Sequence, residues 1–213
     1  MVYSLTAASR EAGLALDTTI GEEALVERAR RGELRAFDEL VLRYQQLAYN
    51  VAYRLLGEAE AAADATQEAF TSAYRNVRGF RGGLFKAWLL RIVTNQCYDV
   101  LRSRQRRPST SLDAMLDDEE SPVEFPDKGE TPEESVLRHE VAAEIQRGLL
   151  TLPVEQRTVV VLFDVQGLSY EEIAEVTRAA MGTVKSRLSR GRAALRDYLT
   201  KRGEHSAGPD RRR

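Results

Sequence analysis

The sequence predicts an all-α protein, with two small helical domains joined by a flexible acidic linker. Apolar residues recur at three- and four-residue steps in two separate stretches, which is the spacing of one helix face. We find no stretch with the two-residue alternation of a half-buried strand. The expected order is an N-terminal tail over 1–20, a first domain over 21–107, the linker over 108–135, a second domain over 136–202 and a C-terminal tail over 203–213.

Composition excludes several classes of protein. With 43% hydrophobic residues, the chain has enough apolar material to bury a core. One cysteine and two distant histidines predict no disulfide framework and no metal site. The longest apolar run, 159–163, is far too short to span a membrane, so we expect a cytoplasmic protein. No nucleophile–base pair or phosphate loop is visible, and we expect no enzymatic activity, cofactor or small-molecule substrate.

The first domain is expected to contain helices throughout. Thr19 and Glu22 fit a capping box, and the helical pattern that follows runs to Gly57. The Ala-rich stretch 58–78 has strong intrinsic helix propensity. A glycine-rich loop then leads to a helix over 84–106.

Two residues of this last helix are expected to be structural. Trp88 and Cys97 lie on its apolar row, so we expect both to pack in the core. A buried cysteine behaves as a small apolar residue, and Cys97 is therefore not expected to be a redox sensor.

Between the domains, the composition changes abruptly. Residues 108–135 contain ten acids, one base and four prolines, which gives a net charge of −9. Such a composition cannot bury much apolar surface and predicts a flexible linker. Solubility alone is the simplest explanation of its charge. The alternative is that it mimics nucleic acid and reduces DNA binding by the free protein.

The second domain is predicted to end in a helix-turn-helix. We expect a helix that ends at Pro153, another over 154–163, a short one over 169–177 and a long basic one over 180–199. Ser169 and Glu172 fit a second capping box at the start of the short helix. The short helix, turn and longer basic helix have the proportions of a DNA-binding helix-turn-helix.

Positive charge is concentrated at the end of each domain, although the whole chain has a net charge of only −2. Residues 91–107 carry a net charge of +4, and residues 178–202 carry +7. Two basic patches predict a polyanion that is contacted twice. On the last helix, hydroxyl and basic side chains suited to the major groove share one region of the surface: Thr183, Lys185, Ser186, Arg187, Ser189, Arg190 and Arg192. The alternative for this helix is an ordinary solvated amphipathic face.

Several strings at matching positions resemble one family. The strings GLSYEEIAEV at 167–176 and GTVKSRL at 182–188 resemble region 4 of bacterial extracytoplasmic-function (ECF) sigma factors. Residues 36–44 resemble the opening of sigma region 2, 64–70 its core-binding segment, and 88–102 its promoter-reading helix. The resemblance implies a protein that directs core RNA polymerase to specific promoters and helps to open them.

The resemblance also assigns roles to residues. Docking on the clamp helices of the large polymerase subunit is expected from Asp64, Gln67 and Glu68. Recognition and opening of the −10 element are expected from Phe80, Arg91, Asn95 and Arg102. Asn95 matches a residue that holds a flipped base, for which an amide offers both a donor and an acceptor. Phe80 either presents an exposed ring to that base or packs in the core. The seven groove residues of the last helix would bind the −35 element, with Arg187, Arg192 and Thr183 suited to phosphates.

Two departures and two alternatives accompany the resemblance. Arg178 occupies a turn position where the family commonly has glycine, and the loop 79–84 is one residue short.

An anti-sigma factor, often membrane-bound in the family, is an implied partner that would hold the protein at the membrane. The first alternative function is a stand-alone helix-turn-helix regulator of duplex operator DNA. The second is a decoy that binds polymerase without reading DNA.

Overall fold

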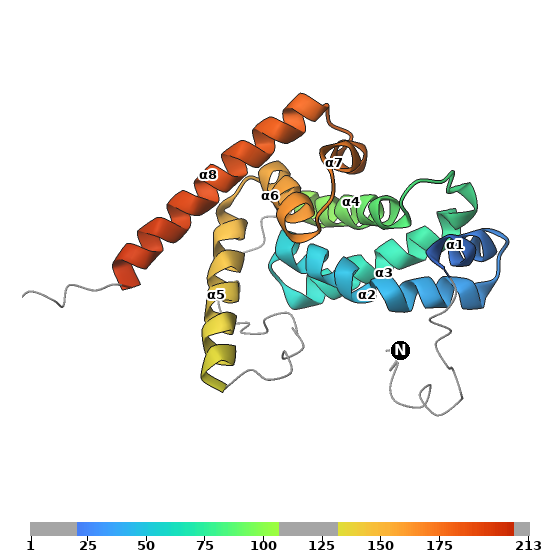
Figure 1. Cartoon of the computed structure of the whole chain (residues 1–213), viewed down its shortest axis with the longest axis horizontal. Helices are drawn as coiled ribbons and strands as arrows, with labels where there is room; N and C mark the ends of the chain where they lie inside the picture. Colours follow the sequence, from blue (N-terminus) through green and yellow to red (C-terminus); the bar gives the residue numbers. More distant parts are fainter. Residues whose placement is uncertain (1–20, 107–131, 207–213) are drawn as a thin grey trace, which may run out of the picture.

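The computed structural model describes residues 21–106 and 132–206 (Figure 1). The predicted N-terminal tail, residues 207–213 of the predicted C-terminal tail and most of the predicted linker lie outside the described residues, as does Thr19 of the first predicted capping box. Residues 203–206, predicted as tail, form the end of α8. Every regular element in the described part of the chain is helical, which confirms the predicted fold class. Within that part, no helix is long and apolar enough to cross a membrane, and no group of three candidate metal ligands is found.

The helices form two consecutive blocks. The N-terminal block, residues 21–106, contains α1 (Glu22–Arg30), α2 (Leu34–Leu56), α3 (Ala59–Asn76), a short 3₁₀ turn η2 (Val77–Gly79) and α4 (Phe85–Arg106). The C-terminal block, residues 132–206, contains α5 (Pro132–Thr151), α6 (Val154–Val160), a π-helical turn η4 (Val161–Val165), α7 (Tyr170–Thr177) and α8 (Met181–Ser206). The helix α5 begins earlier than expected, and its first residue is proline, which is well suited to that position.

The N-terminal block packs α2, α3 and α4 around an aliphatic core. Leu40 and Leu55 of α2 and Leu89 and Val93 of α4 are completely buried. The buried face of α3 consists mainly of alanines, at 62, 65, 69 and 73. Because alanine has a small side chain, α3 lies close to its neighbours and keeps its polar face in solvent.

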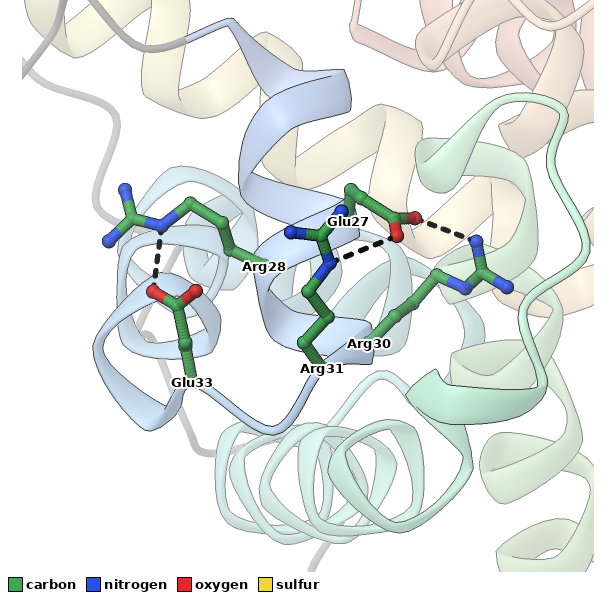
Figure 2. Close-up of polar contacts among 5 residues, drawn as sticks. All are labelled: Glu27, Arg28, Arg30, Arg31 and Glu33. Atoms are coloured by element: carbon green, nitrogen blue, oxygen red, sulfur yellow. Dashed lines mark hydrogen bonds and ion pairs between the residues drawn. The ribbon is translucent and has the colours of Figure 1, made fainter.

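The turn between α1 and α2 is surrounded by ion pairs (Figure 2). Arg28 Nε lies 2.8 Å from Glu33 Oε2, across the turn. Within α1, Glu27 pairs with Arg30 at 2.8 Å and with Arg31 at 3.4 Å. These side chains are exposed, so each pair contributes at most about 1 kcal/mol. Of these pairs, only Arg28–Glu33 joins α1 to the start of α2, whereas the two Glu27 pairs are local to the end of α1.

In the C-terminal block, α8 runs past α6 toward α5 (Figure 1). Two glycines allow this close approach. A Cβ at Gly191 of α8 would lie 2.7 Å from Val160 Cγ2, and a Cβ at Gly148 of α5 would lie 2.7 Å from Leu195 Cδ1. Larger residues at either position would push α8 away from the block.

The two blocks pack against each other in this structure. Buried Arg157 of α6 donates a hydrogen bond to the carbonyl oxygen of Leu55 in α2. Three more hydrogen bonds cross between the blocks: Gln146 Nε2 to Tyr53 O (3.1 Å), Lys86 Nζ to Gln166 O (2.7 Å) and Tyr98 OH to Thr158 Oγ1 (3.0 Å). The buried residues of both blocks form one continuous core. The sequence predicted two separate domains and gave no indication of this contact.

Candidate nucleic-acid interface

The helix-turn-helix is formed by α7 and α8. Ser169 caps α7, because its hydroxyl accepts a hydrogen bond from the Glu172 backbone N–H at 3.2 Å. The Glu172 carboxylate accepts one in return from the Ser169 N–H at 2.6 Å. This capping box was predicted and is confirmed. Buried Ile173 of α7 faces the core together with Val184 and Leu188 of α8, so the recognition helix is anchored on one face.

The turn between the two helices has a left-handed residue that is not glycine. Arg178 has φ 52° and ψ 37°, and it is the non-glycine residue with positive φ in the described part of the chain. Arginine adopts this conformation at a cost of about 1–2 kcal/mol, which glycine would avoid. The turn therefore has the backbone geometry that glycine favours, although this chain has arginine at position 178.

The exposed side of α8 carries most of the predicted −35 residues. Thr183, Lys185, Ser189 and Arg190 are exposed. Ser186 and Arg187 are half-buried, and the Ser186 hydroxyl donates to the Thr183 carbonyl oxygen at 3.0 Å. These side chains form a surface with three bases, Lys185, Arg187 and Arg190, among hydroxyl groups. Such a surface has donors for guanine edges and for phosphates.

Two of the predicted −35 residues, Arg192 and Lys185, have contacts within the protein. Arg192 pairs with Asp164 of η4, and its guanidinium lies 5.0 Å from the centroid of the Phe163 ring. The Lys185 ammonium lies 5.4 Å from the centroid of the Tyr170 ring. Sequence reasoning missed Asp164, Phe163 and Tyr170 as partners of α8. No local pattern links Asp164 to a residue 28 positions later, so only the fold reveals the pair.

The predicted −10 residues lie along α4. Asn95 and Arg102 are exposed, and Arg91 is half-buried. Arg102 pairs with Asp99 at 3.3 Å on the same helix. Burial raises the pKa of the nearby Tyr98 hydroxyl, and Arg187 of α8 is among the groups that oppose this shift. Tyr98 also donates a hydrogen bond to Thr158 Oγ1 of α6, so this face of α4 packs against the C-terminal block.

Phe80 does not present its ring to solvent. It is only 7% exposed, and its ring packs edge-on against Trp88 and Phe85 at centroid distances of 5.4 and 6.0 Å. Of the two alternatives, the packed ring is observed, and the exposed ring is wrong for this structure. Packing against neighbouring aromatic rings removes the apolar surface of Phe80 from water, which favours the buried ring. Trp88 joins the same cluster, and Cys97 is fully buried, as expected.

The predicted docking residues lie together on α3. Asp64, Gln67 and Glu68 are exposed, one helical turn apart, on the side opposite the buried alanines. Two carboxylates and an amide at this spacing form a compact acidic surface. Such a surface can pair with arginines of a partner helix.

Comparison with known proteins identifies the family. The model for sigma-70 region 2 matches residues 40–107, and the model for sigma-70 region 4 matches residues 142–195. The RNA polymerase sigma-H factor of Pseudomonas aeruginosa is 41% identical over 176 residues, which cover 82% of this chain and 91% of the relative. The chain belongs to the RNA polymerase sigma factors. The ECF sigma factor SigW of Bacillus subtilis is 38% identical over 178 residues, covering 82% of this chain and 94% of the relative.

Other relatives and solved structures place this sigma factor in the ECF group. It is 40% identical over 173 residues to the ECF sigma factor SigE of Mycolicibacterium smegmatis, covering 81% of this chain and 65% of that relative's length. The solved complex of sigma factor RpoE with the anti-sigma factor NepR from Bartonella quintana matches with a TM-score of 0.60 and 28% identity, covering 77% of this chain and 96% of that chain. CnrH, solved with the cytosolic domain of CnrY, also matches with a TM-score of 0.60, at 26% identity and 84% and 97% coverage.

The predicted family and its general function are confirmed by these similarities. This ECF sigma factor directs RNA polymerase to promoters and assists the initiation of transcription. The comparisons give no support to a stand-alone regulator.

Proposed function

We propose that the two blocks of this sigma factor divide promoter recognition between them. The N-terminal block docks on core RNA polymerase through α3 and opens the −10 element through α4. The C-terminal block binds the −35 element through α8. This proposal rests on the distribution of exposed charged side chains: those on α3 are mainly acidic, and those on α4 and α8 are mainly basic. The protein catalyses no reaction itself.

Polymerase docking is assigned to Asp64, Gln67 and Glu68. These side chains are exposed, whereas the opposite face of α3 is buried on α2 and α4. Among residues 21–106, no ion pair uses the carboxylate of Asp64 or Glu68, so both charges face solvent. Their spacing suits pairing with arginines on the clamp helices of the large polymerase subunit.

Co-elution with bacterial core RNA polymerase tests this docking surface. The wild-type chain is expected to form a stable complex, and the double variant Asp64→Arg with Gln67→Ala is expected to lose it. Glu23→Arg is the matched control, because it reverses an exposed charge of the same block on α1. Binding by the double variant as tight as that by the wild type would contradict the assignment.

At the −10 element, Asn95 is assigned to the flipped base, because its exposed amide can both donate to and accept from a base edge. Arg91 and Arg102 lie on the same helix and are assigned to the phosphates. Phe80 is assigned to the packing that supports the start of α4, because its ring is covered. At the −35 element, Lys185, Ser186, Ser189 and Arg190 are assigned to base edges, with Thr183 and Arg187 on phosphates.

Simultaneous use of both elements requires the blocks to separate. The −10 and −35 elements are centred about 25 base pairs apart, which is roughly 85 Å of B-DNA at 3.4 Å per base pair. Here α4 contacts the segment that leads into α7, since Lys86 donates to the Gln166 carbonyl oxygen. Residues 107–131 join the blocks and could extend over about 80 Å. We propose that the packed arrangement is a free form, and that the promoter-bound form is open.

We propose that the protein acts in the cytoplasm and that an anti-sigma factor restrains it. Support comes from RpoE of Bartonella quintana, which was solved with the anti-sigma factor NepR. A membrane-bound anti-sigma factor would also hold this protein at the membrane. Competition between a candidate anti-sigma factor and core polymerase for the wild-type chain tests this proposal, and simultaneous binding of both would contradict it.

A further inference from the structure

We propose that Arg192 of the recognition helix is a positioning residue, and that Asp164 and Phe163 of η4 hold it to set the orientation of α8. This inference rests on the proposed binding of the −35 element by α8. It replaces the expected role of Arg192 as a phosphate contact. It also assigns a role in promoter recognition to two residues outside the helix-turn-helix.

Arg192 uses two of its five N–H donors in contacts within the protein, and its side chain is 48% exposed. Its Nε donates to Asp164 Oδ2 at 2.9 Å, and a second N–H donates to Asp164 Oδ1. This two-pronged arrangement matches the planar fork of the guanidinium and fixes its orientation. The Phe163 ring lies 5.0 Å from the guanidinium carbon. A phosphate that approached Arg192 would meet the negative charge of Asp164 beside it.

Helix geometry places Arg192 on the flank of α8 rather than on its outer face. The buried stripe of α8 contains Val184, Leu188 and Gly191. At 3.6 residues per turn, Arg192 lies about 70° from this stripe, whereas Ser186 lies roughly opposite it. A Cβ at the adjacent Gly191 would be 2.7 Å from Val160 Cγ2, so α8 packs closely on α6 beside Arg192.

The π-helical turn brings the acid and the ring to this point. In η4, buried Val161 and Leu162 fix the turn in the core, while Phe163 and Asp164 are more exposed. The Phe163 ring packs on Tyr170 of α7 at a centroid distance of 4.9 Å. Lys185 lies over the other member of this aromatic pair. Two points on α8, two turns apart, therefore contact one pair of rings, and these contacts add to the buried packing of α8 on the rest of the block.

DNA binding by the holoenzyme separates positioning from phosphate contact. The probe is a promoter duplex enriched from a random library by wild-type holoenzyme, and affinity is measured over a range of salt concentrations. Asp164→Asn, Arg192→Ala and Arg192→Lys are each expected to weaken binding about three- to tenfold, because each breaks the paired fork. The double variant Asp164→Asn with Arg192→Ala is expected to be no weaker than either single variant. In all four variants, the dependence of affinity on salt concentration should be the same as in the wild type.

A phosphate contact predicts different results, and any of them would overturn the proposal. Asp164→Asn would leave the affinity for the promoter duplex unchanged or increase it, because the Arg192 guanidinium would lose its carboxylate partner and could pair with a phosphate. Arg192→Lys would retain most of the binding, since lysine also pairs with phosphate. Arg192→Ala would lower the salt slope by about one. Arg190→Ala is the positive control for a DNA contact, because Arg190 is exposed on the outer part of α8.

Hydrogen exchange of the DNA-free chain provides a test that does not depend on promoter binding. Asp164→Asn and Arg192→Ala are expected to speed amide exchange over the middle of α8, whereas Arg190→Ala should not. Unchanged exchange in the first two variants would contradict the positioning role, whatever the DNA result. If wild-type holoenzyme enriches no sequence with a −35 element while the exchange results hold, only the proposed −35 function fails.

Discussion

Arg157 of α6 binds the carbonyl oxygen of Leu55 near the end of α2, although the two residues are 102 positions apart. The same guanidinium donates to the carbonyl oxygens of Leu150 at 2.9 Å and Leu152 at 3.0 Å, at the end of α5. The last carbonyls of a helix have no partner within that helix and carry partial negative charge. Arg157 therefore caps two helix ends at once, one in each block.

Arg157→Met should lower the free energy of unfolding by about 2–4 kcal/mol. Methionine retains apolar volume, but it leaves buried carbonyl groups without donors. Urea unfolding measures the effect, and Arg196→Met on the exposed side of α8 is the control, with an expected change of less than about 0.5 kcal/mol. A loss below about 1 kcal/mol in Arg157→Met would show that water replaces the guanidinium.

Gly57→Ala should destabilise the contact between the blocks. Gly57 ends α2 with φ 77°, and a Cβ there would lie 2.6 Å from Leu150 Cδ1 of α5. We expect a loss of about 2–3 kcal/mol, since backbone strain adds to the steric clash. Thermal unfolding followed by circular dichroism measures it.

Gly82→Ala is the matched control for the clash. Gly82 also has positive φ, at 100°, but nothing lies within 4 Å of its potential Cβ. Its substitution should therefore cost only the backbone strain, about 1–2 kcal/mol. Adding Leu150→Ala should rescue part of the defect of Gly57→Ala and none of that of Gly82→Ala. Equal behaviour of the two glycine variants would contradict the close approach of the blocks.

Arg178→Gly should stabilise the protein. Relief of the left-handed strain gains about 1–2 kcal/mol, and the greater freedom of glycine in the unfolded chain returns about half of it. The expected net gain is about 0.5–1 kcal/mol in the free energy of unfolding by urea. Glu175→Gly, inside α7, should instead destabilise by about 1 kcal/mol. A loss of stability in Arg178→Gly would mean that the arginine makes compensating contacts.

Cys97 should make stability depend on alkaline pH. Burial raises the pKa of the Cys97 thiol from 9.0 to about 12. Between these values, the thiol ionises in the unfolded chain but stays protonated in the folded one, so stability falls as the pH rises above about 9. Urea unfolding at pH 8 and pH 11 should show a larger fall in the wild type than in Cys97→Ala. The pKa values of the half-buried tyrosines Tyr44 and Tyr98 are raised as well, but both tyrosines are present in the two proteins. Equal falls in the two proteins would show that Cys97 is accessible.

Asn95→Ala should impair promoter opening and leave capture of duplex DNA intact. The exposed amide is assigned to a flipped base, which exists only after the strands separate. Permanganate reactivity of the −10 thymines measures opening by the holoenzyme, and filter binding measures capture. Gln105→Ala, an exposed amide near the end of α4, is the control. Normal thymine reactivity with Asn95→Ala would remove this residue from the opening step.

The sequence was sufficient wherever the determinants are local. Helical spacing, alanine content and the Ser169–Glu172 capping box predicted α3, α4 and α7 to within a few residues. The exposed positions of Asp64 and Asn95 followed from the face on which each residue lies. Local rules were not sufficient for Phe80, because an aromatic next to a glycine loop can either pack or protrude. The tertiary neighbours Phe85 and Trp88 decided between the two.

By itself, the sequence determined an all-α chain with two helical blocks, two basic helices and the motifs of a sigma factor. These properties depend on residue type and on the spacing of residues a few positions apart, so they can be recognised directly in the sequence. Only the tertiary structure revealed that Arg157 joins the ends of α2 and α5, and that Asp164 holds Arg192. Both interactions join segments that are distant in the sequence. They form only because the packed helices bring each guanidinium group within hydrogen-bond distance of an oxygen acceptor.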